Sequence, residues 1–294
     1  MELLDYGPLI DFLETQHRSV PARVADLYTG DGMGNGLLAR AGFVPGEGLG
    51  IKLATIFPGN TTLPSIQTVY VVFDAATGAE KVVILGNALT WFKTACDSAL
   101  ASRYLARPGA TALLMVGAGA MAPHLIRAHR AACPSIEEIA IWNRTTARAE
   151  ALASELADLG ARVTTDLEAA VGSADVVSCA TMTVEPLIRG AWLRPGTHLD
   201  LVGAYLPHMR EADDEAIARS RVFVDSRDTT FDTGEIGIPM TTGVITVKKV
   251  LGDHYQLVTG AVPGRTQAHD ITLFKNGGGG HLDLMTAQYL LTRL

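Results

Sequence analysis

The strongest chemical signal in the sequence is a glycine-rich turn at residues 117–122, GAGAMA. It follows the apolar run TALLMV and precedes an Ala-rich stretch of helical character. Glycines between a strand and a helix permit a tight turn and let a pyrophosphate approach the backbone, while the first helical turn supplies N–H donors. A glycine-rich turn without a nucleotide is the alternative. The motif predicts dinucleotide contacts from Gly117, Ala118, Gly119, Ala120 and Met121.

The end of the next apolar run, EEIAIW, bears on which dinucleotide binds. An Asp or Glu there would bind the ribose 2′-hydroxyl and select NAD. The tip instead reads Asn143-Arg144-Thr145, with Arg148 one helical turn later. Arginines can hold a 2′-phosphate by charge-assisted hydrogen bonds. The alternative is that both are merely solvated, but cations at a helix N-terminus are disfavoured by the helix dipole. The tip favours NADP(H) over NAD(H), and by position Thr181 and Met182 are expected beside the nicotinamide or ribose.

Two kinds of element must position these residues. Between residues 108 and 262, short apolar runs alternate with Ala-rich helical stretches, which predicts a parallel sheet in a Rossmann domain. In residues 1–107, a helix over 6–17 precedes strand-like runs at 36–44, 49–57, 67–74 and 81–85, separated by turn signals and followed by a helix from about Leu89. This pattern predicts an antiparallel sheet.

Residues 263–294 contain a strand-like run at 271–274, four glycines at 277–280 and a final helix from about Leu282 to Leu294. That helix is apolar on one side and needs a surface to dock on. We therefore expect the segment 263–294 to return to the first domain, which makes that domain discontinuous. The predicted fold class is α/β, with a Rossmann domain and a discontinuous α+β domain.

Composition narrows the class of protein. The net charge is −7 without long charge runs, which argues against a nucleic-acid surface. Three scattered cysteines, an N-terminus without signal-peptide character and apolar runs too short for a membrane span indicate a cytoplasmic protein. The eight histidines form no HxH or HExxH pattern, so we expect no metal site. His124 and His129 are expected at the surface, and Asp200 is expected to be structural.

The chain resembles the ornithine cyclodeaminase/mu-crystallin family along essentially its whole length. The resemblance rests on a series of short motifs in a fixed order: Pro21-Ala-Arg23, Gly50-Ile-Lys52, the LTWFKTA segment from Leu89, VGAGAMA, WNRT, the VGAYLP segment from Val202, Arg210-Glu211, Thr233-Gly234-Glu235 and Asn276-Gly277. It implies a Rossmann domain plus a substrate and dimerisation domain built from both chain ends. It also implies a homodimer and a nicotinamide cofactor acting on amino and imino acids.

The resemblance further implies that the substrate carboxylate is held by Arg23, Lys52 and Lys93, with Thr94 at the cofactor. Lys93 departs from the family, since many members have Arg there; a Lys still pairs with a carboxylate, but without the bidentate fork. Without the resemblance, Arg23 could equally be a surface charge, and Lys52 could lie on the solvated face of its strand. Lys52 is our candidate proton donor to the imine nitrogen, because neighbouring cations in a partly dry site would lower its pKa. The imine could also enter already protonated.

Members that cyclise ornithine carry an Asp at the position of Tyr205, which we place in the substrate site. A phenol with a reference pKa of ~10 is not an anionic acceptor for an ammonium at neutral pH. The implied activity is NADPH-dependent reduction of a cyclic α-imino acid, Δ1-pyrroline-2-carboxylate or Δ1-piperideine-2-carboxylate. The alternatives are an ornithine cyclodeaminase, another amino or imino acid dehydrogenase, and a mu-crystallin-like NADPH-dependent binding protein.

Overall fold

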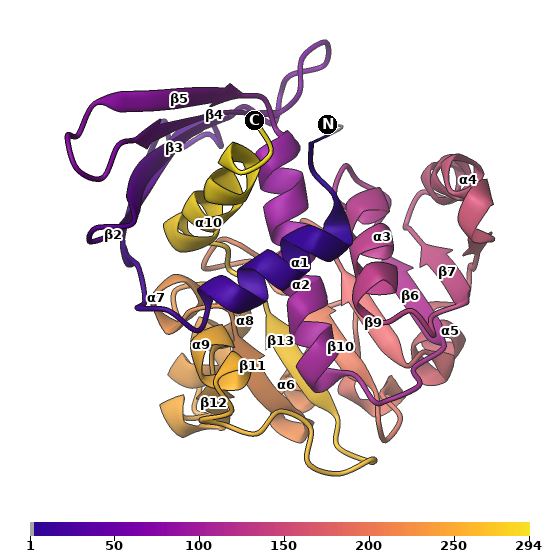
Figure 1. The fold of residues 1–294 in the computed structure, drawn as a ribbon. Coiled ribbons are helices and arrows are strands. Elements are labelled where there is room, and N and C mark those ends of the chain that lie inside the picture. Colours follow the sequence, from indigo (N-terminus) through magenta and orange to yellow (C-terminus); the bar gives the residue numbers. More distant parts are fainter. Residues whose placement is uncertain (1–2) are drawn as a thin grey trace. The chain divides into compact units, whose positions relative to one another are not determined.

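The computed structural model describes residues 3–294, which divide into two compact units (Figure 1). The first unit comprises Met1–Thr94 and Gly279–Leu294, and the second comprises Ala95–Gly278. Helix α2 (Ala88–Leu105) contributes its first residues to one unit and the remainder to the other. The first unit is therefore built from both ends of the chain, as the position of the final helix predicted.

The first unit is an antiparallel sheet with two helices. The sheet is a meander in the order β1 (Arg23–Gly30), β2 (Gly36–Val44), β3 (Gly48–Ile56), β4 (Ile66–Phe73) and β5 (Glu80–Leu85). Four of these strands match the predicted runs within two residues at either end, and β1 is the strand that the sequence analysis did not identify. Its polar and apolar residues are mixed, and seven of its eight residues are exposed in this edge strand.

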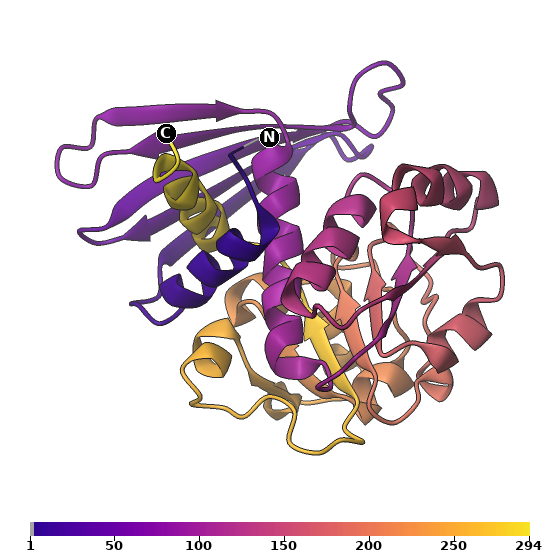
Figure 2. The same cartoon turned by 45° about the vertical axis from the view of Figure 1, so that its right-hand side comes forward.

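Helix α10 (Gly280–Leu291) lies on one face of the sheet, and α1 (Tyr6–Gln16) packs against α10 (Figure 2). The approach is close enough that a Cβ atom on Gly42 would clash with the carbonyl group of Gly280. Two glycines at this crossing let the helix start directly on β2. Alternate residues of β3 are buried on this covered face, so the strand presents one side to α10.

The second unit is a fully parallel sheet flanked by helices (Figure 1). The strands lie in the order β12 (Val250–Gly252), β11 (Arg221–Val224), β13 (Thr272–Lys275), β10 (His198–Leu201), β9 (Val176–Cys179), β6 (Ala112–Val116), β7 (Glu138–Trp142) and β8 (Arg162–Val163). The α-helices are α3 (Ala122–Ala132), α4 (Thr146–Glu155), α5 (Leu167–Ser173), α6 (Asp214–Arg219), α7 (Arg227–Thr230), α8 (Gly234–Thr241) and α9 (His254–Val258). From β6 the chain first adds β7 and β8 on one side and then β9 on the other, so the strand order reverses between β6 and β9. This is the switch point at which Rossmann sheets bind dinucleotides.

The prediction that residues 263–294 all return to the first domain is wrong for residues 263–278. Strand β13 pairs with β10 on one side and β11 on the other, within the parallel sheet. All four of its residues are buried, as expected for a strand covered on both faces. The chain leaves the second unit only at Gly279, immediately before α10. The other boundary also moves, from residue 107 to Thr94.

A buried polar network within the second unit corrects the expectation for His129. Instead of lying at the surface, its ring is buried, with Nδ1 2.9 Å from Ser102 Oγ and Nε2 3.1 Å from Asp200 Oδ2. Ser178 Oγ donates to the same Asp200 oxygen at 2.7 Å, so Asp200 is structural, as predicted. The Ser102–His129–Asp200 network lies in the interior of the second unit. It ties α2, α3, β9 and β10 together.

Among residues 3–294, no helix combines the length and the hydropathy that a transmembrane span requires.

Candidate functional site

The glycine-rich turn follows β6 at the switch point. Gly117 has φ 107°, its N–H donates to Trp142 O at 2.8 Å, and a Cβ atom there would lie 2.7 Å from Ala180 O. Glycine is therefore required at position 117 by the chain itself. Gly119 differs, because it is exposed and a Cβ atom there would meet nothing within 4 Å. No described part of the chain requires a glycine at position 119, so the open space there fits the close approach of a ligand.

The helix that follows offers an anion site. Met121 is the N-cap residue of α3, and its side chain has no oxygen with which to cap the first N–H groups. Pro123 lies in the first turn, where its missing N–H costs nothing. The helix dipole at this end favours a phosphate. These residues fit the pyrophosphate of a dinucleotide.

Asn143 connects the glycine turn to the tip of β7. Its Oδ1 accepts a hydrogen bond from Ala118 N at 3.1 Å, and its Nδ2 donates to Thr145 O at 2.9 Å. Arg144 and Arg148 are exposed on either side of the start of α4. The structure thus brings the predicted turn and strand tip together into one substructure, with two arginine side chains beside it.

Glu211 joins the carboxyl ends of β9 and β10. Its Oε1 accepts from Thr181 N at 2.7 Å and Thr181 Oγ1 at 2.9 Å, and its Oε2 accepts from Gly203 N at 2.6 Å and Ala204 N at 3.3 Å. Two hydrogen bonds from each of two loops thus fix Thr181 and the Gly203-Ala204 turn at the edge where Rossmann ligands bind. The sequence analysis noted Glu211 only as part of a family motif and assigned it no role.

A second acid lies directly behind the first. The Glu235 carboxylate accepts hydrogen bonds from Glu211 N at 2.8 Å and Ala212 N at 3.0 Å. Burial, reinforced by the neighbouring Glu211, raises the pKa of Glu235 to about 7, although Lys275 opposes the shift. The two carboxylates and Lys275 form a buried charged group beneath the β9 and β10 loops.

The remaining predicted residues of the second unit lie on these loops. Met182 is 65% exposed and directly follows Thr181, while Tyr205 is half-buried after β10. Both stand beyond the carboxyl ends of their strands, the edge that carries the glycine turn. Their roles toward cofactor and substrate stay predictions.

In the first unit, the two predicted lysines converge on an acid that the sequence analysis did not identify. Lys52 Nζ lies 2.8 Å from Asp283 Oδ2 and 3.1 Å from Oδ1, and Lys93 Nζ lies 3.8 Å from Oδ1. All three side chains are buried. We call Lys52, Lys93 and Asp283 the cation cluster; its members come from β3, α2 and α10. The available signal was an acid within the apolar run Leu282-Asp283-Leu284.

A row of polar residues crosses the sheet beside this cluster. Consecutive cross-strand partners are Asp26 on β1, Arg40 on β2, Lys52 on β3 and Tyr70 on β4. Arg40 Nε pairs with Asp26 Oδ2 at 2.9 Å. Burial, together with Lys93 and Arg40, lowers the pKa of Lys52 to about 8, although Asp283 opposes the shift. Burial likewise raises the pKa of Tyr70, so its phenol is neutral.

The structure does not bring Arg23 to the lysines. Arg23 is exposed at the start of β1, and its cross-strand partner is Phe43, which alternates with the residues on the Lys52 face. A carboxylate contact from Arg23 stays a prediction. Thr94 follows Lys93 on α2 and is half-buried.

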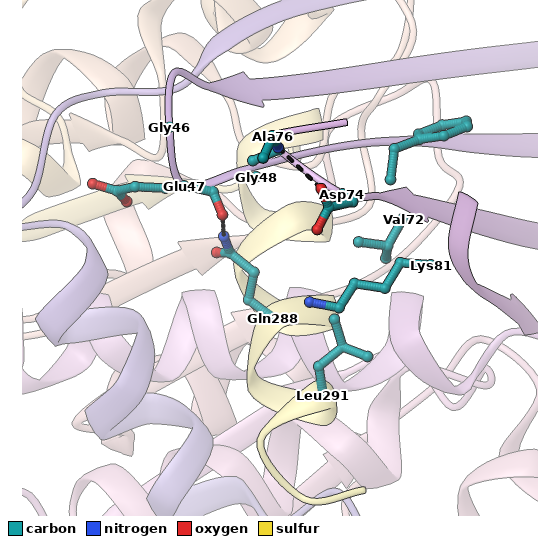
Figure 3. Close-up of a pocket in the computed structure, with 11 residues that line it drawn as sticks. Gly46, Glu47, Gly48, Val72, Asp74, Ala76, Lys81, Gln288 and Leu291 are labelled. Carbon is teal, nitrogen blue, oxygen red and sulfur yellow. Dashed lines mark hydrogen bonds between the residues drawn. The ribbon is translucent and has the colours of Figure 1, made fainter. Parts of the chain in front are cut away.

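A separate hollow of about 430 Å³ lies where two hairpin turns of the sheet meet the end of α10 (Figure 3). Gln288 Nε2 donates weakly to Glu47 O at 3.4 Å, and Lys81 extends toward Gln288. Asp74 is occupied in capping its own turn, since it accepts from Ala76 N and Thr77 N. None of the predicted site residues lines this hollow.

Comparison with known proteins adds independent evidence. A family model described as the ornithine cyclodeaminase/mu-crystallin family matches residues 43–294. A Paracoccus denitrificans protein named Δ1-pyrroline-2-carboxylate reductase is 44% identical over 294 residues, covering 98% of this chain and 92% of that protein.

Two solved structures have the same fold over 99% of this chain, each at 27% identity. The Thermococcus litoralis Δ1-pyrroline-2-carboxylate reductase in complex with NADH and L-proline has a TM-score of 0.94, with 94% of that chain covered. The iminosuccinate reductase of Paracoccus denitrificans in complex with NAD⁺ has a TM-score of 0.89, with 92% covered. On its motifs, its two-unit fold and these matches, the chain belongs to the ornithine cyclodeaminase/mu-crystallin family.

Proposed function

We propose that this protein is an NAD(P)H-dependent reductase that converts Δ1-pyrroline-2-carboxylate to L-proline. Δ1-Piperideine-2-carboxylate, which would give L-pipecolate, is the proposed second substrate. The observation that carries the proposal is the cation cluster, in which Lys52 and Lys93 share the single carboxylate of Asp283. The names of the Paracoccus relative and of the Thermococcus complex with L-proline support the same substrate class.

The charge of the cation cluster fits a substrate with one carboxylate. Two ammonium groups and one carboxylate leave one positive charge in excess in a buried place. An uncompensated buried charge is costly, so the cluster favours a ligand that brings one negative charge. Tyr205 provides no second acid for the distal amine of ornithine, which disfavours cyclodeamination.

The second unit would hold the cofactor. The open space at Gly119, the uncapped N-terminus of α3 and Asn143 suit a pyrophosphate and an adjoining ribose. When bound, the nicotinamide supplies the hydride that reduces the imine carbon. Thr181, held by Glu211, and Met182 would line that end. Because no carboxylate stands at the tip Asn143-Arg144-Thr145, we propose that NADPH is preferred over NADH.

Reduction also requires a proton on the imine nitrogen, because protonation makes the adjacent carbon electrophilic. We assign this proton to Lys52, directly or through a water molecule. Its pKa of about 8 lies close to neutral pH, where a general acid both holds its proton and releases it readily.

A homodimer belongs to the same proposal. The face of the antiparallel sheet opposite Lys52 carries exposed apolar side chains on four of its five strands: Leu27, Leu37, Phe43, Leu53, Val83 and Leu85. An apolar sheet face of this extent is typical of a surface that a protein partner covers. A second copy of the chain is the proposed partner, and light scattering on the purified protein would give its mass.

The test is a panel of substrates with both cofactors, followed by the loss of reduced cofactor. We expect rapid turnover of Δ1-pyrroline-2-carboxylate with NADPH and slower turnover with NADH. Iminosuccinate, an acyclic dicarboxylate, should react poorly. Binding of NADPH and cyclic imino acids without turnover would contradict the proposal and favour a binding protein.

Ornithine distinguishes the remaining alternative. With L-ornithine and the oxidised cofactor we expect no release of ammonia, because Tyr205 replaces the acid that this chemistry requires. Proline and ammonia appearing at rates near those of imine reduction would instead identify a cyclodeaminase. The Tyr205→Asp variant should weaken imine reduction before it creates any cyclodeaminase activity.

A further inference from the structure

We infer that Asp283 is a positioning residue for Lys52, one that fixes the lysine side chain and keeps it as an ammonium ion able to protonate the substrate. The inference deepens the proposed function and rests on it. It assigns a role to a buried acid near the C-terminus, 231 residues from Lys52 in the chain.

The geometry is that of a two-point contact. Lys52 Nζ reaches both carboxylate oxygens of Asp283, at 2.8 and 3.1 Å, whereas Lys93 Nζ approaches only one, at 3.8 Å. Asp283 lies in the first turn of α10, and this helix crosses β3 on the face that carries Lys52. The acid therefore holds Lys52 more tightly than Lys93, and it does so from a rigid element.

Apart from Asp283, the charged groups that act on Lys52 favour its neutral amine form. Arg40 on β2 and Lys93 on α2 are cations that act on Lys52, and burial itself penalises the ammonium ion. Tyr70 on β4 is neutral, and Asp26 on β1 is already paired with Arg40. At the start of α10, the ring of His281 lies edge-on to that of His17 on α1, 6.1 Å away.

Asp283 is the anion that offsets these effects. With its charge present, the pKa of Lys52 is about 8, so most of the lysine is protonated at neutral pH. Without that charge, burial and the two cations would lower the pKa of Lys52 further. A neutral Lys52 has no proton to give to an imine, so the rate would fall at neutral pH although the lysine remains in the chain.

The test is the pH dependence of kcat/KM for Δ1-pyrroline-2-carboxylate in the wild type and in Asp283→Asn. We expect the alkaline midpoint to move down by about one pH unit or more, which is a loss of at least about threefold near pH 7.5 that approaches ~10-fold above pH 9. Much of this loss should be regained near pH 6, where Lys52 is protonated again. The substrate is the same in both profiles, so the difference between them belongs to the protein.

Asp26→Asn is the matched control. It makes the same change at an acid on the same sheet face, but one that pairs with Arg40 and not with Lys52. We expect its alkaline midpoint to move much less than that of Asp283→Asn, because Asp26 acts on Lys52 only through Arg40. An acid of purely structural importance would lower kcat/KM at every pH and leave the midpoint unchanged. Such a profile for Asp283→Asn would overturn the inference.

Two further measurements cover the other outcomes. If Asp283→Asn does not fold, Asp283→Glu retains the charge but displaces it: the midpoint should stay while kcat falls, and unchanged kinetics would overturn the positioning role. If the wild type reduces no imino acid, the proposed function fails by itself. The titration of Lys52 then remains measurable by NMR on lysine-labelled protein, with Lys52→Arg to assign the signal. Equal Lys52 midpoints in wild type and Asp283→Asn would contradict the inference.

Discussion

The cation cluster of the first unit and the glycine turn of the second are both suited to bind anions, but by opposite means. The turn at residues 117–122 would use backbone N–H groups and the start of a helix, all within six consecutive residues. The cluster would use the lysines of β3 and α2, at positions 52 and 93, which share the carboxylate of Asp283 on α10. Backbone recognition is therefore sensitive to an added Cβ atom, and side-chain recognition is sensitive to the loss of one charge.

The two regions also differ in the sign of their buried charge. The cation cluster carries one excess positive charge, whereas Glu211 and Glu235 outnumber Lys275 beneath the β9 and β10 loops. The first arrangement suits an anionic substrate. The second uses both acids to accept backbone N–H groups, so its carboxylates organise loops and do not face an anion. Four predictions test this contrast.

The largest effect is expected from Lys52→Met, which removes the charge nearest to Asp283. Loss of a general acid typically reduces the rate by about 10²–10⁴-fold, so kcat/KM for Δ1-pyrroline-2-carboxylate should fall by that amount. NADPH affinity, measured by fluorescence titration, should change by less than about twofold because its contacts lie in the second unit. Arg40→Met, at the next cation on the same sheet face, is the control. An equal loss in both variants would show that general positive charge, and not Lys52 itself, matters.

The next largest effect concerns the two glycines of the turn, which should differ in whether an added methyl group impairs stability or NADPH binding. Gly117→Ala places a side chain at φ 107° and against Ala180 O, so it should cost about 2–4 kcal/mol of unfolding free energy. Gly119→Ala meets no atom within 4 Å and should change stability by less than about 0.5 kcal/mol. Its NADPH dissociation constant should nevertheless rise at least about tenfold, since the methyl group fills the space for the pyrophosphate. Denaturation and nucleotide titration of both variants measure this; unaltered NADPH binding by Gly119→Ala would remove the turn from the cofactor site.

Arg144→Ala tests the tip of β7. If Arg144 binds the 2′-phosphate, the variant should lose about 1.5–3 kcal/mol of NADPH affinity, the scale of a hydrogen bond to a charged group. NADH affinity should hardly change, because NADH lacks that phosphate. Calorimetric titration with both nucleotides gives the two values. An equal loss for both would show that Arg144 does not distinguish them.

The smallest effect concerns the pH dependence of stability. The pKa of Glu235 is about 7 in the folded protein and near 4.5 when unfolded, so between these values the folded state binds more protons. The contribution of Glu235 to the free energy of unfolding therefore falls as the pH rises through this window. In Glu235→Gln, the decrease in unfolding free energy between pH 5 and pH 7.5 should be smaller than in the wild type by about 1–3 kcal/mol. The variant should also lose about 1 kcal/mol at every pH, because one hydrogen bond is weakened. Denaturant unfolding near pH 5 and pH 7.5 measures both; an unchanged slope would place the titration elsewhere.

Residues that act within a short segment could be predicted from the sequence. The glycine turn, the tip Asn143-Arg144-Thr145 and four strands of the antiparallel sheet each depend on neighbours within about ten residues. The order and spacing of residues within these short segments were therefore sufficient to predict them. The resemblance to the family added Lys52 and Lys93 as a pair, which the structure brings to one carboxylate.

Tertiary structure alone decided which distant residues complete these sites. Asp283 joins Lys52 only because α10 crosses β3, and Arg40 and Asp26 join the row only through strand register. In the same way β13 enters the parallel sheet by pairing with β10 and β11, and the buried ring of His129 finds a partner in Asp200, 71 residues away in the chain. A buried charge is tolerated only beside its partner, and the sequence gives no distance between residues 52 and 283. The local backbone features could therefore be predicted from the sequence, whereas the pairing of buried charges is determined only by the tertiary structure.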